Sequence, residues 1–169
     1  GELRTRMCIL MADRGISDLV SDGPIKVNHD GTDFEVNLLD TSGQDTYSAM
    51  RDQYLRIFNV AVFGISLEDP TILNKFLNEL VPALERFIED RPRPVVLWAA
   101  NPDVQNPVVT EELLNRLMTA KPYIRQVHII RQYGHYLDKD DVRKLLTSCL
   151  DLSRIVFPDF PAPESFELS

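Results

Sequence analysis

Apolar and polar residues follow two different periods along the chain, and these periods predict strands and helices in turn. Short apolar runs bounded by charged residues or prolines are typical of buried strands in a parallel sheet. Four such runs occur, and we expect a strand in each. They lie at residues 6–11, 60–65, 94–100 and 126–130.

Before the apolar run at residues 60–65, the chain shows a second pattern that is typical of strands. Residues 25–28 and 34–38 alternate between apolar and polar positions, and Asp30-Gly31 lies between them. Alternation predicts half-buried strands, and an Asp-Gly pair is typical of a tight hairpin turn. We therefore expect an antiparallel hairpin whose second strand ends on the carboxylate of Asp40.

Three later segments repeat their apolar residues at three- and four-residue steps, as amphipathic helices do. The first begins after Pro70 and contains Pro82, where we expect a kink because proline cannot donate a backbone hydrogen bond. Thr110 can cap the second helix, and the third begins near Asp140. The expected inward residues are Ile72, Phe76, Leu80, Leu84 and Ile88, then Leu113, Leu114, Leu117 and Met118, then Val142, Leu145, Leu146, Cys149 and Leu152.

Length and charge narrow the class of protein. A chain of 169 residues suits one domain, which we assign to residues 1–157, followed by a proline-rich tail at residues 158–169 that acts as a linker or docking strip. Hydrophobic residues make up 44% of the chain and charged residues 26%, and the net charge is −8. The negative charge argues against a nucleic-acid partner and against a basic membrane-binding surface.

Targeting signals and cysteines give only general information about the location of the protein. No apolar run reaches the length of a membrane span, and neither a signal peptide nor a prenylation box is present, so we expect a cytoplasmic protein with no direct membrane anchor. Cys8 and Cys149 each lie in an apolar segment and are expected to be buried free thiols. Because the chain starts at Gly1 rather than Met, a larger multidomain protein or complex stays open.

The stretch from the second hairpin strand to residue 55 indicates a particular protein family more specifically than the patterns above. The strand ending at Asp40 runs into the turn Asp40-Thr41-Ser42-Gly43-Gln44, and residues 47–55 then repeat as an amphipathic helix. This stretch resembles the strand, switch II turn and helix of Ras-like small GTPases, with the run Tyr47 to Tyr54 closest to the Ras branch. The resemblance implies that Asp40 helps to hold Mg²⁺, that the Gly43 amide meets the terminal phosphate and that Gln44 orients the attacking water.

The resemblance also implies a fold. The order of expected elements agrees with the three-layer α/β G-domain, which has a mostly parallel central sheet and one antiparallel edge strand. Residues between the first strand and Asp40 are too few for the family's first helix and a full switch I loop, so we expect both to be shortened. Thr32, beyond the hairpin turn, is interpreted as a strand residue and not as the switch I threonine.

The segment that should bind phosphates departs from the family pattern. The first expected strand leads into residues 11–18, where the family has G-x-x-x-x-G-K-[ST]. Here Met11 and Ile16 replace the glycines, Ser17 replaces the lysine and Asp18 replaces the magnesium-binding hydroxyl. Ile16 resists the positive φ that glycine supplies. Two unit charges about 4 Å apart repel by roughly 4 kcal/mol at an effective dielectric near 20, so acidic residues here oppose a polyphosphate.

The segment that should recognise guanine also departs from the family pattern. After the strand at residues 94–100 the family has Asn-Lys-x-Asp, and here Asn101 matches while Pro102 and Val104 replace the lysine and the aspartate. Asp103 stands one position early, which aims a strand-end side chain elsewhere. Where the family has a Ser-Ala-Lys loop, this chain has residues 131–135 with no match.

These departures lead to three functional hypotheses. The first is a pseudoGTPase that retains Asp40, Gly43, Gln44 and Asn101 only as vestiges, needs no nucleotide or metal cofactor, and acts as a regulatory or scaffolding interaction module in signalling. The second is a divergent, slow GTPase that binds GTP or GDP with Mg²⁺, in which Arg14 or another group replaces the lysine. The third is a structural subunit of a larger assembly. The expected protein-binding residues, on the switch II helix, are Tyr47, Met50, Arg51 and Tyr54.

Overall fold

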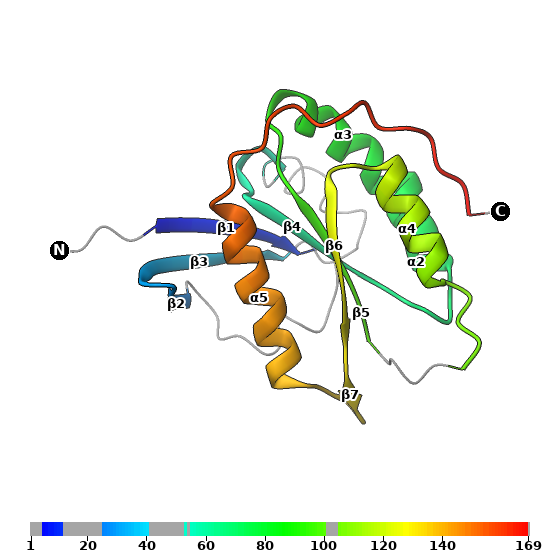
Figure 1. Ribbon diagram of the computed structural model, residues 1–169, viewed down its shortest axis with the longest axis horizontal. Helices are drawn as coiled ribbons and strands as arrows, with labels where there is room; N and C mark the ends of the chain where they lie inside the picture. Colours follow the sequence, from blue (N-terminus) through cyan, green and yellow to red (C-terminus); the bar gives the residue numbers. More distant parts are fainter. Residues whose placement is uncertain (1–4, 12–24, 41–52, 54, 101–104, 169) are drawn as a thin grey trace.

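The computed structural model describes residues 5–11, 25–40, 53, 55–100 and 105–168. A central β-sheet separates two layers of helices (Figure 1). α2, α3 and α4 lie on one side of the sheet, and α5 lies on the other. The expected three-layer α/β arrangement is therefore confirmed.

The sheet has six strands in the order β2-β3-β1-β4-β5-β6. β2 pairs with β3 in the antiparallel direction, and every other neighbouring pair is parallel, as predicted. The expected shortening of the first helix and of switch I concerns residues 12–24, which lie outside the described residues. The strands are β1 (Thr5–Met11), β2 (Ile25–His29), β3 (Thr32–Asp40), β4 (Val60–Ile65), β5 (Val95–Ala100) and β6 (Ile124–Ile130).

The hairpin between β2 and β3 turns at the predicted residues. Asp30 has φ +50° and Gly31 has φ +77°. Two successive residues with positive φ define a type I′ turn, whose twist matches that of the flanking strands. Thr32 pairs with His29 as the first residue of β3, so its interpretation as a strand residue is confirmed.

The helix that follows β4 is interrupted where Pro82 predicts a break. α2 (Thr71–Lys75) passes into a π-helical turn (Phe76–Leu80) before α3 (Val81–Asp90) begins. Because Pro82 has no N–H, the regular ladder cannot continue, and the N–H of Val81 bonds to Phe76 O, five residues back. The single kinked helix that the sequence predicts is thus three helical pieces.

The two later helices start at capping side chains. Thr110 Oγ1 accepts a 3.1 Å hydrogen bond from the N–H of Leu113 at the start of α4 (Glu111–Ala120), as predicted. Asp138 caps α5 (Lys139–Ser153) by accepting a 3.0 Å bond from the N–H of Asp141. α5 therefore starts one residue before the expected position.

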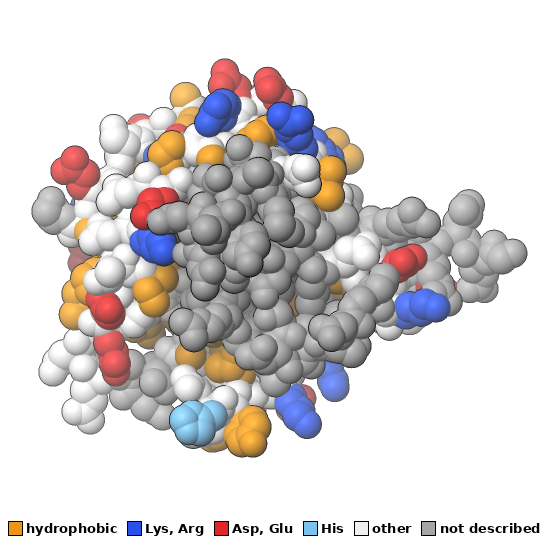
Figure 2. Space-filling model, turned by 180° about the vertical axis from the view of Figure 1, so that it is seen from behind, with side chains coloured by type: hydrophobic (Ala, Val, Ile, Leu, Met, Phe, Trp, Pro, Cys, Tyr) orange, Lys and Arg blue, Asp and Glu red, His pale blue; other side chains and the backbone are white. Residues whose placement is uncertain are grey.

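Each face of the sheet has its own apolar core. Along β4, Val60 and Val62 face α5, whereas Ala61, Phe63 and Ile65 face α2, α3 and α4. Both faces are buried because helices cover both, which explains why β4 is an unbroken apolar run in the sequence. Acidic and basic side chains are interspersed over the described surface that Figure 2 shows.

Residues 154–168 leave α5 as an irregular segment that lies against the domain. Phe160, Phe166 and Leu168 pack against the core on the α3 and α4 side of the sheet. The division of the chain at residue 157 stays a prediction. Among the described residues, no helix is long and apolar enough to cross a membrane.

Candidate functional site

The candidate site lies at the carboxyl edge of the parallel strands. In open α/β sheets, ligands bind outside this edge because the loops that follow the strands converge there. Met11 pairs with Asp40, so β1 and β3 end at the same level, and Ala100 pairs with Ile130, so β5 and β6 end at another common level. β4 ends between them at Ile65.

The structure describes the backbone of one predicted site residue, Asp40. It is the last residue of β3, beside Met11, the last residue of β1. The chain therefore leaves β1 and β3 at neighbouring positions. The other predicted site residues lie outside the described residues: Gly43, Gln44 and Asn101 of the vestigial nucleotide site, and Tyr47, Met50, Arg51 and Tyr54 of the expected partner surface.

The end of the switch II helix is described and is fixed to the core. Leu55 and Phe58 are buried, whereas Arg56 and Ile57 are exposed. Arg91, which follows α3, donates 3.0 Å hydrogen bonds from Nη1 to the carbonyl oxygens of Arg56 and Phe58. These bonds satisfy carbonyl groups that have no partner within a helix end.

The loop that follows β4 is fixed by short-range hydrogen bonds. Ser66 Oγ accepts bonds from the N–H groups of Glu68 and Asp69, at 3.3 and 3.1 Å. Asp69 Oδ1 in turn accepts a 3.0 Å bond from the N–H of Thr71 at the start of α2. Hydrogen bonds from the side chain and backbone of Thr71 lower the pKa of Asp69. Two exposed carboxylates therefore stand at this edge of the sheet.

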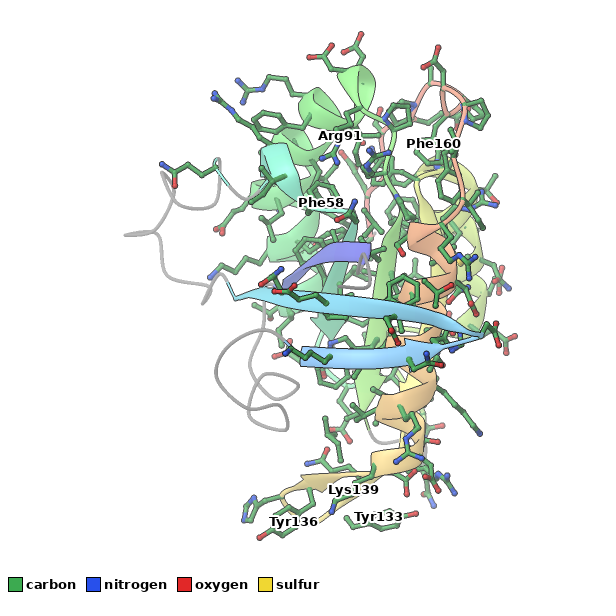
Figure 3. All side chains as sticks on the ribbon, turned by 90° about the vertical axis from the view of Figure 1, so that its left-hand side faces the viewer. Phe58, Arg91, Tyr133, Tyr136, Lys139 and Phe160 are labelled. Atoms are coloured by element: carbon green, nitrogen blue, oxygen red, sulfur yellow. The ribbon has the colours of Figure 1, made fainter. Side chains whose placement is uncertain are left out.

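A small hairpin follows β6, at the position of the family's base-binding loop. β7 (Gln132–Tyr133) pairs with β8 (Tyr136–Leu137), and Gly134 in the turn has φ +60°. Tyr133 and Tyr136 are 59% and 75% exposed, and they lie at the end of the molecule opposite Phe160 (Figure 3). No strand was expected at residues 131–137, so this hairpin is a difference from the prediction. Its signal is a glycine at the first central turn position between two strand-forming tyrosines.

Arg131 closes the base of this hairpin. Its Nε and backbone N–H both donate 2.9 Å hydrogen bonds to Asp141 Oδ2, and its Nη2 lies 3.2 Å from Asp138 Oδ2. The hydrogen bonds from the Arg131 side chain, and then from its backbone, lower the pKa of Asp141 to about 2. The guanidinium is thus bound by two carboxylates in the first turn of α5. Sequence reasoning did not find this contact, because the two residues are separated by the hairpin.

One group of potential metal ligands occurs among the described residues, away from this edge. His29 Nε2 lies 2.7 Å from Asp151 Oδ1 and 3.7 Å from Asp30 Oδ2. The three side chains join the β2–β3 turn to the last turn of α5, at the amino edge of the sheet. They connect two elements and contribute nothing to the nucleotide edge.

The fold and the order of the strands define a G-domain of the small GTPase class. The Ras family profile matches residues 19–130, and the chain belongs to the Ras family. The match begins directly after the phosphate-loop positions 11–18 and ends at Ile130, the last residue of β6. A comparison with curated proteins gives no match.

Proposed function

We propose that this Ras-family domain is a pseudoGTPase that works as a protein interaction module without a bound nucleotide or metal. The observation that carries the proposal is the position of Met11 beside Asp40. This register supports the alignment of residues 11–18 with the phosphate-binding segment of the family. That segment has no lysine, and its glycine and hydroxyl positions hold Ile16 and Asp18.

Charge at the same edge supports the proposal. Glu68 and Asp69 follow β4 and add negative charge at the edge where a polyphosphate and its metal would bind. In the sequence, Asp13 and Asp18 follow β1 and add two more negative charges. Arg131 does not offset them, because its guanidinium is bound by Asp138 and Asp141. A charged hydrogen bond contributes about 1.5–3 kcal/mol, so several missing contacts together weaken binding by many orders of magnitude.

The segments that would bind the guanine base also support the pseudoGTPase proposal. Pro102 and Val104 replace the lysine and aspartate that would contact guanine, and the hairpin of β7 and β8 stands where the base-covering loop would lie. A hairpin fixed by Arg131 at its base has a defined shape of its own. Loss of phosphate and base contacts in the same chain favours a scaffold over a switch.

The proposed partner surface is the switch II helix, through Tyr47, Met50, Arg51 and Tyr54. The described end of this helix supports it: Arg56 and Ile57 are exposed beside the buried Leu55 and Phe58. A helix anchored on one side can present its other side to a partner protein.

Nucleotide binding is tested by calorimetric titration of the purified chain with GDP and GTP, with and without Mg²⁺. Chromatography of the supernatant after denaturation identifies any nucleotide that co-purifies. We expect no released nucleotide and no binding at millimolar concentrations. Micromolar binding would overturn the proposal and favour the slow GTPase, with Arg14 as the first residue to substitute.

The slow GTPase has one observation in its favour. Asp40 stands at the strand end that the family uses for Mg²⁺, and Gly43 and Gln44 follow it in the sequence. The same residues also suit a sharp turn from strand to helix, because aspartate and glycine are common turn residues. The titration with Mg²⁺ therefore separates the two candidates.

The interaction surface needs a second experiment. We expect the double variant Tyr47→Ala/Arg51→Ala to lose capture of its protein partner from an extract of the source cells, with an unchanged circular dichroism spectrum. Tyr136→Ala/Lys139→Ala is a matched control, because it removes an exposed ring and an exposed cation elsewhere. Equal capture by the first variant and the wild type would exclude the switch II helix as the surface.

A further inference from the structure

Residues 157–168, called the strap below, lie across the domain after α5 ends. Most strap side chains are exposed, and the exceptions are all large and apolar. Those that are partly buried are Phe157, Phe160, Phe166 and Leu168. The strap thus contacts the domain through aromatic and aliphatic anchors spaced along an extended chain.

The anchors connect the two layers of the fold. Phe157 packs against the core on the α5 side, and Phe160 packs against the core on the α3 and α4 side. Their rings lie 5.4 Å apart, and the guanidinium of Arg125, in β6, lies 5.6 Å from the ring of Phe157. The strap therefore passes the amino end of β6 on its way from one layer to the other.

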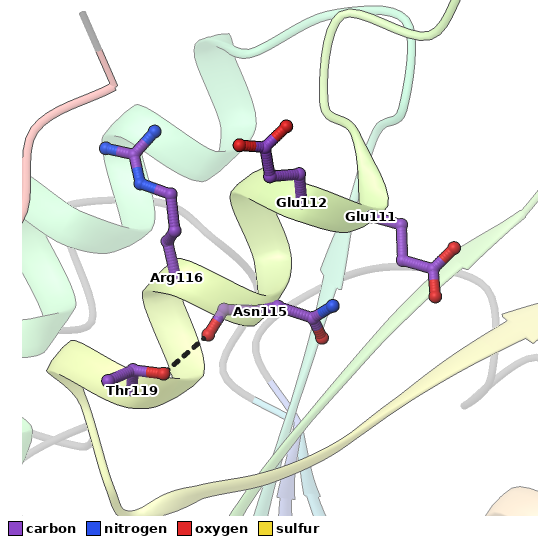
Figure 4. A pocket seen from close by; sticks show the side chains of 5 residues that line it. All are labelled: Glu111, Glu112, Asn115, Arg116 and Thr119. Atoms are coloured by element: carbon purple, nitrogen blue, oxygen red, sulfur yellow. Dashed lines mark hydrogen bonds between the residues drawn. The ribbon is translucent and has the colours of Figure 1, made fainter.

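Beyond Phe160 the strap follows α4. The N–H of Glu164 donates a 2.8 Å hydrogen bond to Ala120 O, at the end of α4. Two residues later along the strap, the ring of Phe166 lies 5.8 Å from the guanidinium carbon of Arg116, one turn earlier in the helix. The strap and α4 thus run antiparallel. A shallow depression on the same helix lies ahead of this path (Figure 4), lined by Glu111, Glu112, Asn115, Arg116 and Thr119.

The contacts of the strap are those of a bound peptide. It contains no helix or strand, and in the described part of the chain the bond from Glu164 to Ala120 is its one backbone hydrogen bond to the domain. Pro158, Pro161 and Pro163 favour an extended conformation in the free chain, which lowers the entropy lost on docking. The anchors are only partly buried, so each can leave its site without opening the core.

We propose that α4 and the start of β6 form a docking surface for an extended acidic segment with aromatic anchors, and that the strap occupies this surface reversibly in cis. Charge complementarity selects the segment. The strap contains Asp159, Glu164 and Glu167 and no basic residue, whereas the surface offers Arg116 and Arg125 to the aromatic rings. The surface lies at the amino end of β6, so the proposal does not rest on the function of the carboxyl edge.

The test uses a fluorescent peptide with the sequence of residues 155–169, titrated with the full chain. A segment joined directly to α5 reaches its surface at an effective concentration of about a millimolar, so the wild-type strap competes with added peptide. We expect Phe160→Ala/Phe166→Ala, which releases the strap, to bind the peptide at least about tenfold more tightly than the wild type. A peptide with the same two substitutions should not bind.

Matched variants identify the contacts. Ser165→Ala changes an exposed strap residue and should bind the peptide as weakly as the wild type does. Arg116→Ala, added to the released variant, should weaken peptide binding about threefold by removing the contact with Phe166. Equal affinity of the wild type and a folded released variant would overturn the proposal, and so would a dimer that forms through exchanged straps.

Hydrogen exchange of the wild-type chain gives a second test that needs no variant. Reversible opening of the strap should let the amide of Glu164 exchange at least about 100-fold faster than the core amides of α5. An amide of Glu164 that exchanges as slowly as those core amides would mean that the strap leaves only on global unfolding. That result would overturn the proposal even if the released variant failed to fold.

Discussion

Nη1 of Arg91 lies 3.0 Å from the carbonyl oxygen of Phe58 and donates a hydrogen bond to it, and Figure 3 shows both residues at the same end of the molecule. A second bond of 3.0 Å reaches Arg56 O. One side chain therefore connects the segment after α3 to the end of the switch II helix. This contact fixes the described end of the switch II helix relative to the core.

Substitution of Arg91 should loosen this connection. We expect Arg91→Ala to lower the free energy of unfolding by about 2 kcal/mol, because two carbonyl groups lose a charged donor. Urea denaturation measures the loss, and hydrogen exchange at residues 55–58 should rise with it. Arg86→Ala, an exposed change in α3, is the control. Unchanged exchange at residues 55–58 would show that the helix end does not depend on Arg91.

A buried ion pair connects α3 to the turn after α4. Lys121 Nζ lies 2.7 Å from Glu85 Oε1, and the hydroxyl of Tyr123 donates a 2.8 Å bond to the same oxygen. Lys121 is 5% exposed and Tyr123 is 1% exposed. Burial, together with the Glu85 carboxylate, raises the pKa of Tyr123.

Removing the carboxylate should therefore be costly. We expect Glu85→Ala to destabilise the fold by about 3 kcal/mol, because it leaves a buried ammonium without a partner. Glu85→Gln should cost less, since its amide oxygen still accepts from Tyr123. Chemical denaturation measures both, with Glu89→Ala, an exposed carboxylate of the same helix, as the control. Similar midpoints for Glu85→Ala and Glu89→Ala would contradict the prediction.

The contact between Arg131 and Asp141 gives a pH-dependent prediction. The pKa of Asp141 is lowered from 3.8 to about 2, so the folded state favours the ionised form. The stability from this contact is complete above 3.8 and is lost as the pH falls through about 2. We expect Arg131→Gln to return the pKa of Asp141 toward 3.8, as measured by NMR titration.

Lys144→Gln is the control for this titration. It removes a nearby positive charge whose effect on Asp141 is smaller than that of the Arg131 hydrogen bonds, so the pKa should change little. An Asp141 pKa that is the same in Arg131→Gln and the wild type would show that Arg131 does not hold the carboxylate. The hairpin of β7 and β8 would then need another anchor.

Substitution of Gly31 should destabilise the fold because of its backbone conformation and not because of side-chain crowding. Its φ is +77°, and apart from Gly31 and its two neighbours in the chain no residue has an atom within 4 Å of the position that a β-carbon would occupy. We expect Gly31→Ala to lower the free energy of unfolding by about 1 kcal/mol, because alanine resists positive φ. Gly31→Asn should cost less, since asparagine adopts this conformation more readily. Equal stability of Gly31→Ala and the wild type would show that the turn can change its conformation.

Cys149 is predicted to be unreactive in the folded protein. It is fully buried, and burial raises its pKa to about 12, so almost no thiolate forms at neutral pH. Iodoacetamide at pH 8 should leave the peptide that contains Cys149 unmodified until guanidinium chloride unfolds the chain. Mass spectrometry resolves this peptide from that of Cys8. Rapid labelling of Cys149 in the native protein would contradict its burial.

Most of the fold could be predicted because the local patterns in this sequence agree with the final structure. The apolar run of β4, the Asp30-Gly31 turn and the Thr110 cap each depend on residues close together in the chain. The proline at position 82 likewise breaks its helix by a local effect. The sequence by itself therefore determined the six strands of the central sheet, the helical segments that follow β4, and the family.

The tertiary structure alone decided which distant residues meet. Arg91 with Phe58, Lys121 with Glu85, and Arg116 with Phe166 are pairs that no periodicity relates. The same holds for the strap, whose sequence fits a linker as well as a docking strip. Such contacts form because the folded sheet brings the ends of separate helices together. Hydrogen bonds and packing then stabilise the charged and aromatic side chains that become neighbours. Local sequence does not carry that information.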